Sequence, residues 1–428
     1  VLILVLLYFA ISLSLQKKLL QLQMHLTENA FIIVLLKTKM QQLQNKNVRI
    51  ESVDSLRGFA ILAILLVHSL NHFNFPVFPT GSPEWLNTID FYISKVLFIL
   101  FDGKAYAIFA LLFGFTFYIQ SNNQKLKGKD FGYRFLWRMV LLVAFATINA
   151  AFFSGGDVLL LFFIQSITLF TTRKWSNKAI LISAIIFLLQ PIEWYQYFSN
   201  QLFDLKVQET QTQLMSSIKN ENFGKFILTN ITIGQKASLA WSINEGRFFQ
   251  TGGLFLLGFY FGRIQLFLPT KQNIRKWVNI LIAFSLSTTI LFLINKFAIN
   301  DSTFSFYQPV KIAMKMWQNL SFALAIIATF IILYQKSKIR QILNKLCIYG
   351  KMSLTNYISQ SIIGAIIYYP IGLNLASYCG NAISTLIALL TFLAQIHFSK
   401  WWLKNHKQGP LESLWHKWTW INFSSNNK

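Results

Sequence analysis

Charged residues are scarce in this chain of 428 residues: only 13% are Asp, Glu, Lys or Arg, while 54% are hydrophobic. A soluble domain carries about 25% charged residues, so half of the usual polar coating is missing. Apolar runs recur along most of the sequence, and a helix needs roughly 20 mostly apolar residues to cross a bilayer. The scarcity of charge therefore argues against a soluble protein and predicts an all-α, polytopic transmembrane helical bundle.

Acidic residues are scarcer still, with 15 against 39 basic residues and a formal net charge of +24. Such an excess can indicate nucleic-acid binding. Here the basic residues gather in short loops between apolar runs, as the positive-inside rule predicts for cytoplasmic loops. No basic, aromatic-rich soluble module stands apart from these runs, so we expect no nucleic-acid partner.

Cysteine is almost absent, since the sequence contains only Cys347 and Cys379. The expected topology puts them on opposite membrane faces, so we expect no disulfide between them. No cysteine or histidine cluster has the spacing of a zinc site, and we expect no metal. The sequence also lacks a dinucleotide-type glycine fingerprint, a P-loop and a nucleophile elbow. The usual signatures of soluble enzymes are therefore absent.

Ten apolar runs after residue 50 predict ten membrane spans. They cover residues 56–74, 104–120, 134–152, 157–172, 178–195, 240–262, 277–297, 316–335, 352–370 and 381–399. The segment "WLNTIDFYISKVLFILFDGK" is too short and too charged to cross, so we expect an interfacial or re-entrant helix there. With ten spans the strongly basic loops all fall on one side. The loops near residues 75–90, 153–156 and 371–380 contain no Lys or Arg. This asymmetry predicts that both termini are cytoplasmic.

The two ends of the sequence are expected to differ from the bundle. Residues 1–48 open with an apolar run that is short for a span, and Met40 stands where a short cytoplasmic leader would begin. We interpret residues 1–39 as an over-extended reading frame or a dispensable appendage. Residues 49–400 form the predicted transmembrane bundle, and residues 401–428 form a basic cytoplasmic tail.

The stretch "RIESVDSLRGFAILAILLVHSLNHF" places ionisable side chains in an apolar run. Such residues cost a few kcal/mol each near the bilayer centre and therefore need partners or a function. In a helix, Arg57 and His68 lie on one face, roughly 16 Å apart along the axis. His72 follows His68 by four residues and is expected on the same face. Asp54 lies one turn before Arg57.

These residues have a structural and a functional interpretation. In the structural one, Arg57 snorkels to lipid headgroups, Asp54 caps the helix and His68 hydrogen-bonds to a neighbouring helix. In the functional one, His68 is a proton carrier, because a buried histidine can titrate near neutrality.

Other candidates come from polar residues in apolar surroundings. Asp157 in "SGGDVLLLF" either caps a helix or orients His68 or His72 with its carboxylate. Asn356 and Gln360 in "LTNYISQS" share a helix face, and they either line a cavity or join neighbouring helices.

Two charged clusters mark predicted helix ends. Asp102 and Lys104 flank Gly103, and an ion pair that interrupts the helix is the simplest interpretation. In "NEGRFF", Glu245 either pairs with Arg247 or caps the helix.

Three further segments carry structural predictions. The four glycines of "TGGLFLLGFYFG" (Gly252, Gly253, Gly258 and Gly262) predict close packing between helices. The motif "GPLESLW" predicts a cytoplasmic cap on the bundle, with Pro410 at a helix start. The outer loop 196–236 has mixed charges and aromatic residues, and we interpret it as a lid over an acceptor site.

The spacing of an arginine, ten residues and a histidine after "SVDSLRG" resembles the first span of the acyltransferase-3 family of membrane acyltransferases. The rest of the chain is more similar to the related YeiB-like family (domain of unknown function 418). The matching pieces are "FALLFGFTFYIQ", "GGDVLLLF", "GRFFQTGGLFLLGFYFGR", "YGKMSLTNYISQSII" and "GPLESLW". The YeiB-like pattern more often has Asn where this chain has His68, so His68 follows the acyltransferase-3 arrangement instead. The YeiB-like pattern also tends to have Trp and Arg where this chain has Ser413 and His416.

The resemblance implies transfer of an acyl group from cytoplasmic acyl-CoA, with acetyl-CoA the expected donor, to an acceptor at the outer face. The acceptor would be an envelope sugar, a lipid or a small molecule, and the location the bacterial cytoplasmic (inner) membrane, with membrane lipids as partners. The expected catalytic residues are His68, His72 and Asp157. The expected donor-binding residues are Arg57, Asp54, Lys104, Arg247, Asn356 and Gln360.

Two other functions stay open at this stage. A small-solute transporter would show internal repeats and interrupted helices at matching positions, and no such symmetry is visible in the sequence. A non-catalytic envelope scaffold would tolerate the loss of His68. The sequence leaves the oligomeric state open.

Overall fold

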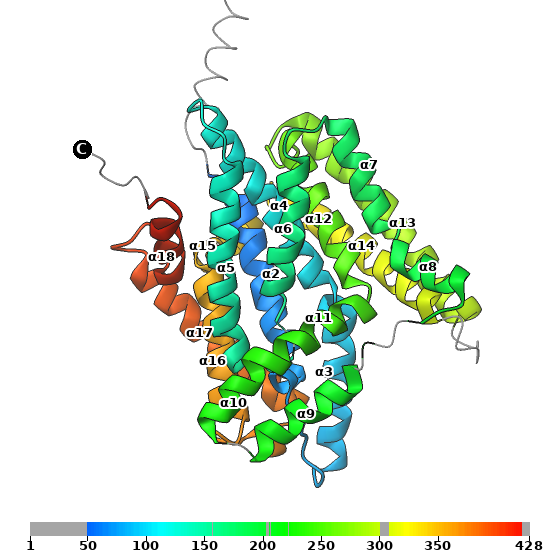
Figure 1. The fold of residues 1–428 in the computed structure, drawn as a ribbon, viewed down its shortest axis with the longest axis vertical. Coiled ribbons are helices and arrows are strands. Elements are labelled where there is room, and N and C mark those ends of the chain that lie inside the picture. The colour runs from blue at the N-terminus through cyan, green and yellow to red at the C-terminus, as the bar shows by residue number, and fades with distance from the viewer. Residues whose placement is uncertain are drawn as a thin grey trace, which may run out of the picture. The chain divides into compact units, whose positions relative to one another are not determined.

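The computed structural model describes residues 49–155, 157–202, 205, 207–220, 222–299 and 308–421. The chain divides into two compact units, Val1–Arg49 and Ile50–Lys428. The predicted extension of residues 1–48 lies outside the described residues, as does the end of the predicted tail, residues 422–428. In the second unit, every regular element that the structure describes is a helix (Figure 1).

The α-helices, in chain order, are α2 (Glu51–Leu70), α3 (Glu84–Phe101), α4 (Lys104–Lys125), α5 (Gly132–Phe152), α6 (Leu159–Thr172), α7 (Asn177–Leu188), α8 (Pro191–Ser199), α9 (Val207–Asn220), α10 (Phe223–Thr229), α11 (Gln235–Asn244), α12 (Arg247–Arg263), α13 (Lys271–Ile294), α14 (Gln308–Leu333), α15 (Ser337–Lys351), α16 (Ser353–Tyr368), α17 (Asn381–Trp402) and α18 (Pro410–Thr419). Short 3-10 segments are η1 (His72–Asn74) and η5 (Ala376–Tyr378), and short π segments are η2 (Asn230–Gly234) and η3 (Asn295–Ile299).

Helix starts follow local sequence signals. Ser176, Asn222 and Thr270 cap α7, α10 and α13, because each side-chain oxygen accepts a hydrogen bond from a backbone N–H three residues later. Pro410 is among the first residues of α18, as predicted, since the first turn of a helix does not need the missing N–H.

Six helical stretches in the described residues are long and apolar enough to cross a membrane. They are Glu51–Leu70, Glu84–Lys125, Gly132–Phe152, Lys271–Phe297, Gln308–Leu333 and Asn381–Asn405. A seventh results if α7 and α8, which meet at an angle of 46°, form one bent span. The all-α membrane class is therefore confirmed, whereas the count of ten spans and the cytoplasmic termini stay predictions.

The remaining predicted spans are short helices. α6, α12 and α16 have 14, 17 and 16 residues, against the roughly 20 that a straight crossing needs. The segment predicted to be interfacial forms α3, none of whose residues is buried, and it continues into α4 as one apolar stretch of 42 residues. Its placement at the membrane interface stays a prediction.

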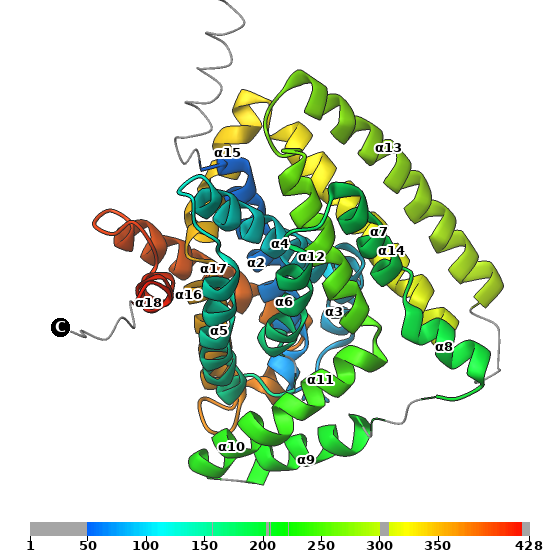
Figure 2. The ribbon, with the colours of Figure 1, turned by 45° about the horizontal axis from the view of Figure 1, so that its top comes forward.

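Helix α2 lies in the interior of the bundle and packs against α4, α15, α16 and α17 (Figure 2). Most of its residues are buried. Gly58 lets the helix approach α15, because a Cβ at this position would collide with the carbonyl oxygen of Leu346. This interior position explains why polar residues of α2 find partners in protein rather than in lipid.

Helices α4 and α12 form a second close pair. A Cβ at Gly258 would collide with the backbone oxygen of Leu111, and a Cβ at Gly114 with that of Phe255. Added Cβ atoms at Gly252, Gly253 and Gly262 would also crowd neighbouring side chains. The prediction that these glycines serve close packing is confirmed.

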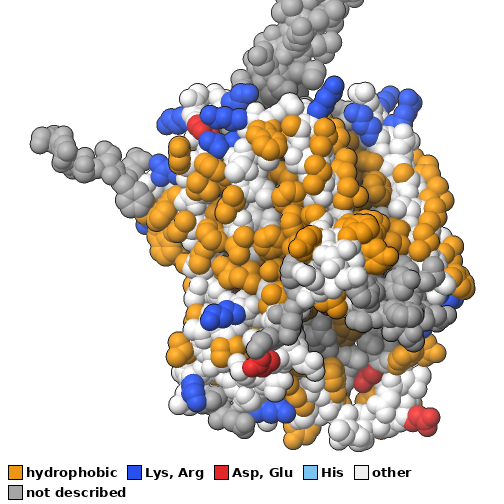
Figure 3. All heavy atoms as spheres, turned by 45° about the vertical axis from the view of Figure 1, so that its right-hand side comes forward, with side chains coloured by type: hydrophobic (Ala, Val, Ile, Leu, Met, Phe, Trp, Pro, Cys, Tyr) orange, Lys and Arg blue, Asp and Glu red, His pale blue; other side chains and the backbone are white. Residues whose placement is uncertain are grey.

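The outer helices expose apolar surface. In the most apolar 18 residues of the helical stretch Lys271–Phe297, which contains α13, only 6% are buried in the protein. Ile282, Leu286 and Ile290 of α13 are exposed. Figure 3 shows hydrophobic side chains across the middle of one face, with lysine and arginine side chains gathered above them. This arrangement fits a lipid-facing belt bordered by headgroups, as expected of a membrane protein.

Helix α18 packs beside α5 and α16 (Figure 1), and the cytoplasmic placement predicted for "GPLESLW" stays a prediction. The Glu412 carboxylate accepts hydrogen bonds from the backbone N–H groups of Leu354 (2.6 Å) and Thr355 (3.1 Å) and from the Thr355 hydroxyl (2.6 Å). It thereby caps α16 from another helix. Burial raises the pKa of Glu412, and these hydrogen bonds oppose the rise.

Candidate functional site

A cavity of about 310 Å³ lies inside the bundle beside the C-terminal end of α2. That volume is at the lower end of the range for small-molecule sites, roughly 300–1,000 Å³. The polar side chains that line it include His68, Asp102, Tyr106, Gln211, Arg247 and Tyr357. They come from helices that are distant in sequence, so only the folded bundle creates the site.

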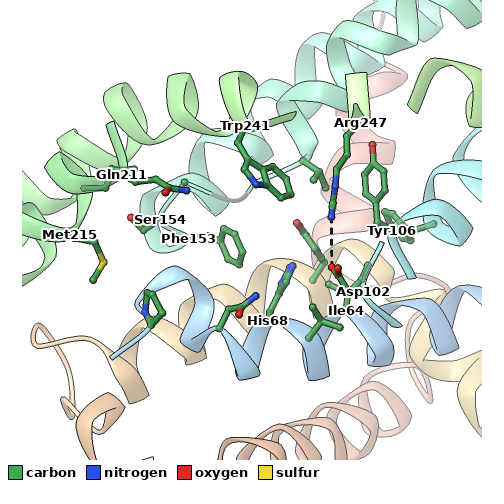
Figure 4. A pocket seen from close by; sticks show the side chains of 18 residues that line it. Ile64, His68, Asp102, Tyr106, Phe153, Ser154, Gln211, Met215, Trp241 and Arg247 are labelled. Atoms are coloured by element: carbon green, nitrogen blue, oxygen red, sulfur yellow. Dashed lines mark ion pairs between the residues drawn. The ribbon is translucent and has the colours of Figure 1, made fainter. Parts of the chain in front are cut away.

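His68 projects from the last turn of α2 into this cavity (Figure 4). Its ring is 4.7 Å from that of Phe153 and 6.4 Å from that of Tyr357, measured between centroids. Within the described ranges no hydrogen bond engages either ring nitrogen of His68. The imidazole is therefore held by aromatic contacts and leaves both nitrogens available to a ligand.

Two helix breaks bring a pair of opposite charges to the same cavity. Asp102 ends α3 and is followed by Gly103, whose φ of 72° is left-handed. Arg247 begins α12 directly after Gly246, which also has a left-handed φ of 69°. The Arg247 guanidinium lies 3.7 Å from the Asp102 carboxylate (Figure 4).

The predicted partners in these two clusters were wrong. Among the residues that the structure describes, no ion pair joins Asp102 to Lys104, whose ammonium lies 5.7 Å from the centroid of the Phe322 ring. Glu245 pairs with Lys315 at 2.7 Å instead of with Arg247. The pairing differs because α14 approaches both breaks, which the sequence does not reveal.

Aromatic rings hold Arg247 in place. Its guanidinium carbon is 4.3 Å from the centroid of the Trp241 ring and 5.1 Å from that of Tyr106. The Tyr106 hydroxyl is itself hydrogen-bonded to the Thr251 hydroxyl. Guanidinium groups stack well on aromatic faces, so the orientation of Arg247 is fixed without consuming its N–H donors.

Asp157 does not line the cavity itself but precedes Val158, which does, in the connection between α5 and α6. Its Oδ1 accepts hydrogen bonds from the Asn149 amide and from the backbone N–H of Leu159, both at 3.1 Å, so the prediction of a helix cap is confirmed. Its Oδ2 is buried without a hydrogen-bond partner in the described part of the chain.

Tyr357 connects Asp157 with the cavity. It lines the cavity, and its buried hydroxyl has no hydrogen bond of acceptable geometry among the described residues. Nor does any hydrogen bond join Asp157 directly to His68 there. A role for Asp157 in orienting His68 stays a prediction, and Tyr357 is the residue through which it would act.

His72 does not join His68, so the prediction that the two share a face is wrong. Helix α2 ends at Leu70, and the left-handed φ of His72 (41°) turns the chain away. The His72 Nε2 lies 2.8 Å from the Ser384 hydroxyl, and the ring stacks on Tyr368 at 4.7 Å.

The predicted donor-binding residues other than Arg247 do not line the cavity. Arg57 pairs with Asp54 at 2.7 Å and donates to the Thr116 hydroxyl at 3.0 Å. Asn356 and Gln360 both hydrogen-bond to Tyr349 of α15, through its carbonyl oxygen and its hydroxyl respectively. These two amides join helices, which was the structural alternative.

Sequence reasoning missed Tyr106, Trp241 and Tyr357 as lining residues. Tyr357 stands next to Asn356 and therefore lies 100° around α16 from the face that Asn356 and Gln360 form, which joins helices as their second interpretation had it. No signal in the sequence distinguishes the two faces. The loop interpreted as a lid contributes Gln211, Leu214 and Met215 of α9 to the cavity wall.

The fold and the site define a helical membrane protein with a small, partly polar cavity in its interior. The family described as "Protein of unknown function (DUF418)" matches residues 261–422. The chain is 26% identical over 419 residues to the "Uncharacterized protein YxaH" of Bacillus subtilis (strain 168), which covers 88% of this chain and 96% of that protein.

Two other relatives extend the similarity. The "Uncharacterized 39.9 kDa protein in amylase 3'region" of Bacillus acidopullulyticus is 24% identical over 379 residues, covering 87% of this chain and 94% of its own. The "Uncharacterized protein YeiB" of Escherichia coli (strain K12) is 25% identical over 386 residues, covering 86% and 95%. The family match over residues 261–422 and the similarity to YxaH and YeiB over most of the chain together support a YeiB-like DUF418 protein.

Proposed function

We propose that this protein is an integral-membrane acyltransferase of the bacterial inner membrane. It moves an acyl group from cytoplasmic acyl-CoA to a hydroxyl or amine acceptor that enters from the outer face. The observation that carries the proposal is His68, an imidazole whose nitrogens have no hydrogen bond within the described ranges and which faces a cavity of about 310 Å³. The resemblance of the Arg57–His68 spacing to the acyltransferase-3 family supports the choice of reaction.

The chemistry requires one proton carrier and one oxyanion donor. His68 accepts the proton of the acceptor hydroxyl or amine as its oxygen or nitrogen attacks the thioester carbonyl. The carbon–sulfur bond then breaks, and the coenzyme A thiolate takes the proton back from His68 as it leaves. The Tyr357 hydroxyl, which lines the same cavity, donates a hydrogen bond to the oxyanion formed at the carbonyl oxygen.

The donor fits this site only in part. A cavity of about 310 Å³ is far smaller than coenzyme A, so it holds the acyl end and part of the pantetheine arm. Arg57 lies on the same helix, roughly 16 Å away along the axis, within reach of the donor phosphates. Phosphate binding there would have to compete with the contact between Arg57 and Asp54. Asn356 and Gln360 would act indirectly, by holding the helix that carries Tyr357.

The test measures acetyl-CoA binding and thiol release by the purified protein in nanodiscs, with envelope extracts as the source of acceptor. Loss of a general base typically lowers turnover by about 10²–10⁴-fold, so His68→Ala should lose at least about 100-fold. His397→Ala is the matched control, because His397 is exposed on α17 and bonds only its own helix backbone in the described residues. Turnover by His68→Ala equal to that of His397→Ala would refute the proposal.

A small-solute transporter is the second candidate, and helix interruptions favour it. Left-handed residues break the helical path at Gly103, Gln190 and Gly246, with φ values of 72°, 64° and 69°. Transporters often bind substrates where helices are discontinuous, and two of these breaks adjoin the cavity. Solute uptake by proteoliposomes without acyl-CoA would favour transport, whereas thiol release without uptake would favour the acyltransferase.

A further inference from the structure

We infer that Arg247 recognises a carboxylate on the small molecule that enters the cavity beside His68. This deepens the proposed function, because the carboxylate would belong either to the acceptor or to the acyl group of the donor. The inference rests on the state of Arg247, on the charges of the cavity wall and on the position of His68 relative to both.

Arg247 is a buried cation whose hydrogen-bonding capacity is unused. The whole residue is 8% exposed, yet no hydrogen bond from its guanidinium to a described residue is formed. Its contact with Asp102, at 3.7 Å, exceeds the 2.7–3.2 Å of an N–H···O hydrogen bond. A guanidinium has five N–H donors, and buried donors are normally satisfied. Since Arg247 lines the cavity, a ligand is the natural partner for these donors.

The charges of the wall favour a carboxylate over a phosphate. Among the described residues that line the cavity, Asp102 and Arg247 are the two with formal charges, and they balance. A ligand with one negative charge can replace Asp102 beside the guanidinium, because Asp102 keeps 35% of its side chain exposed and its contact with Arg247 is longer than a hydrogen bond. A phosphate dianion would leave an uncompensated charge in a cavity whose other described lining side chains carry no formal charge, which is costly. The planar guanidinium also matches a carboxylate with two parallel hydrogen bonds.

The geometry orients the ligand. Trp241 and Tyr106 fix the guanidinium plane, and Figure 4 shows Arg247 and His68 entering the same space from opposite walls. A molecule whose carboxylate binds Arg247 therefore presents its other end to His68. Asp102 is a weakly bound counter-ion of Arg247, a placeholder that the carboxylate of the ligand displaces.

The experiment titrates the purified protein in nanodiscs with carboxylates of two to six carbons, each beside its neutral amide; succinate and succinamide are one pair. The carboxylates should bind and the amides should not. Arg247→Gln should weaken carboxylate binding at least about tenfold, because hydrogen bonds to a charged group are lost. Arg247→Lys should recover only part of the affinity, since an ammonium cannot bind in bidentate fashion. Asp102→Asn should tighten binding about threefold to fivefold by removing the placeholder.

Arg138→Gln is the matched control. Arg138 is also stacked on a tryptophan, with its guanidinium carbon 3.6 Å from the Trp415 centroid, but it does not line the cavity. Its carboxylate affinity should equal that of the wild type. Equal binding of acids and amides, or weaker binding by Asp102→Asn, would overturn the inference even if Arg247→Gln does not fold.

Two further arms separate this inference from the proposed function and identify the source of the carboxylate. His68→Ala should still bind carboxylates while losing thiol release, so carboxylate binding without any acyl transfer would refute only the acyltransferase. Thiol release with no preference for acids would refute only the role of Arg247. If the carboxylate belongs to the donor, succinyl-CoA should bind more tightly than acetyl-CoA, and Arg247→Gln should abolish the difference. If it belongs to the acceptor, the two donors should bind alike.

Discussion

Two of the arginine–aspartate pairs that the structure describes, Arg57 with Asp54 and Arg247 with Asp102, differ in how completely each arginine is satisfied. Arg57 and Asp54 are 2.7 Å apart, and Arg57 also donates to the Thr116 hydroxyl. Arg247 and Asp102 are 3.7 Å apart, and aromatic rings hold the arginine in place. The first pair uses its hydrogen-bonding capacity within the protein, whereas the second keeps that capacity for the cavity. The difference separates a pair that stabilises the fold from a pair that can bind a ligand.

Asp54→Asn should produce the largest loss of stability. The side chains of Asp54 and Arg57 are only 7% and 17% exposed, so removing the carboxylate leaves a largely buried guanidinium without its counter-charge. Breaking such a pair should lower the free energy of unfolding by about 1–3 kcal/mol. Denaturant titration in detergent micelles would measure the change. Glu51→Gln, at an exposed position of the same helix, should leave stability almost unchanged, and equal effects of the two substitutions would contradict the comparison.

Sequence spacing puts Asp54 one turn before Arg57, although we expected the arginine at lipid headgroups and the aspartate as a helix cap instead of the ion pair that they form. Nothing in the sequence places Asp102 beside Arg247. Asp54 and Arg57 are three residues apart on one helix, where spacing alone makes neighbours. Asp102 and Arg247 meet only because two helices break and their ends converge. The membrane class could be predicted from composition, because it depends on how many residues are apolar or charged. It does not depend on which segments meet in the fold.

The wrong predictions at the site concern where a helix ends and which neighbour each helix face contacts. His72 was expected beside His68 because the periodic pattern continues, but α2 ends at Leu70 and the left-handed φ of His72 takes the chain off the helical path. In α16 the polar residues Asn356 and Gln360 marked a helix face correctly, yet that face packs on α15 and not on the cavity. Tyr357 faces the cavity instead. Periodicity identifies a face but does not say what lies opposite it.

Glu412→Ala should have an intermediate effect on stability. This carboxylate resembles Asp54 in being fully used within the protein, since it accepts three hydrogen bonds at the start of α16. Loss of a helix cap typically costs about 0.5–2 kcal/mol. Hydrogen exchange should accelerate at the Leu354 and Thr355 amides, and Glu412→Gln should retain part of the protection because an amide oxygen still accepts. Unchanged exchange in the alanine variant would show that α18 does not cap α16.

Asp102→Asn should have the smallest effect on stability and is the sharpest test of the comparison. Asp102 is 35% exposed, and its contact with Arg247 is too long for a strong hydrogen bond. Exposed ion pairs contribute about 0–1 kcal/mol, so the free energy of unfolding should change by less than about 0.5 kcal/mol. The same denaturant titration that measures Asp54→Asn would decide. A loss as large as that of Asp54→Asn would mean that Asp102 is a structural counter-ion of Arg247, and the arginine would then not be free to exchange it for a ligand. A small loss, together with tighter carboxylate binding, would mean that the protein holds Arg247 through Trp241 and Tyr106 and keeps its charge for the cavity.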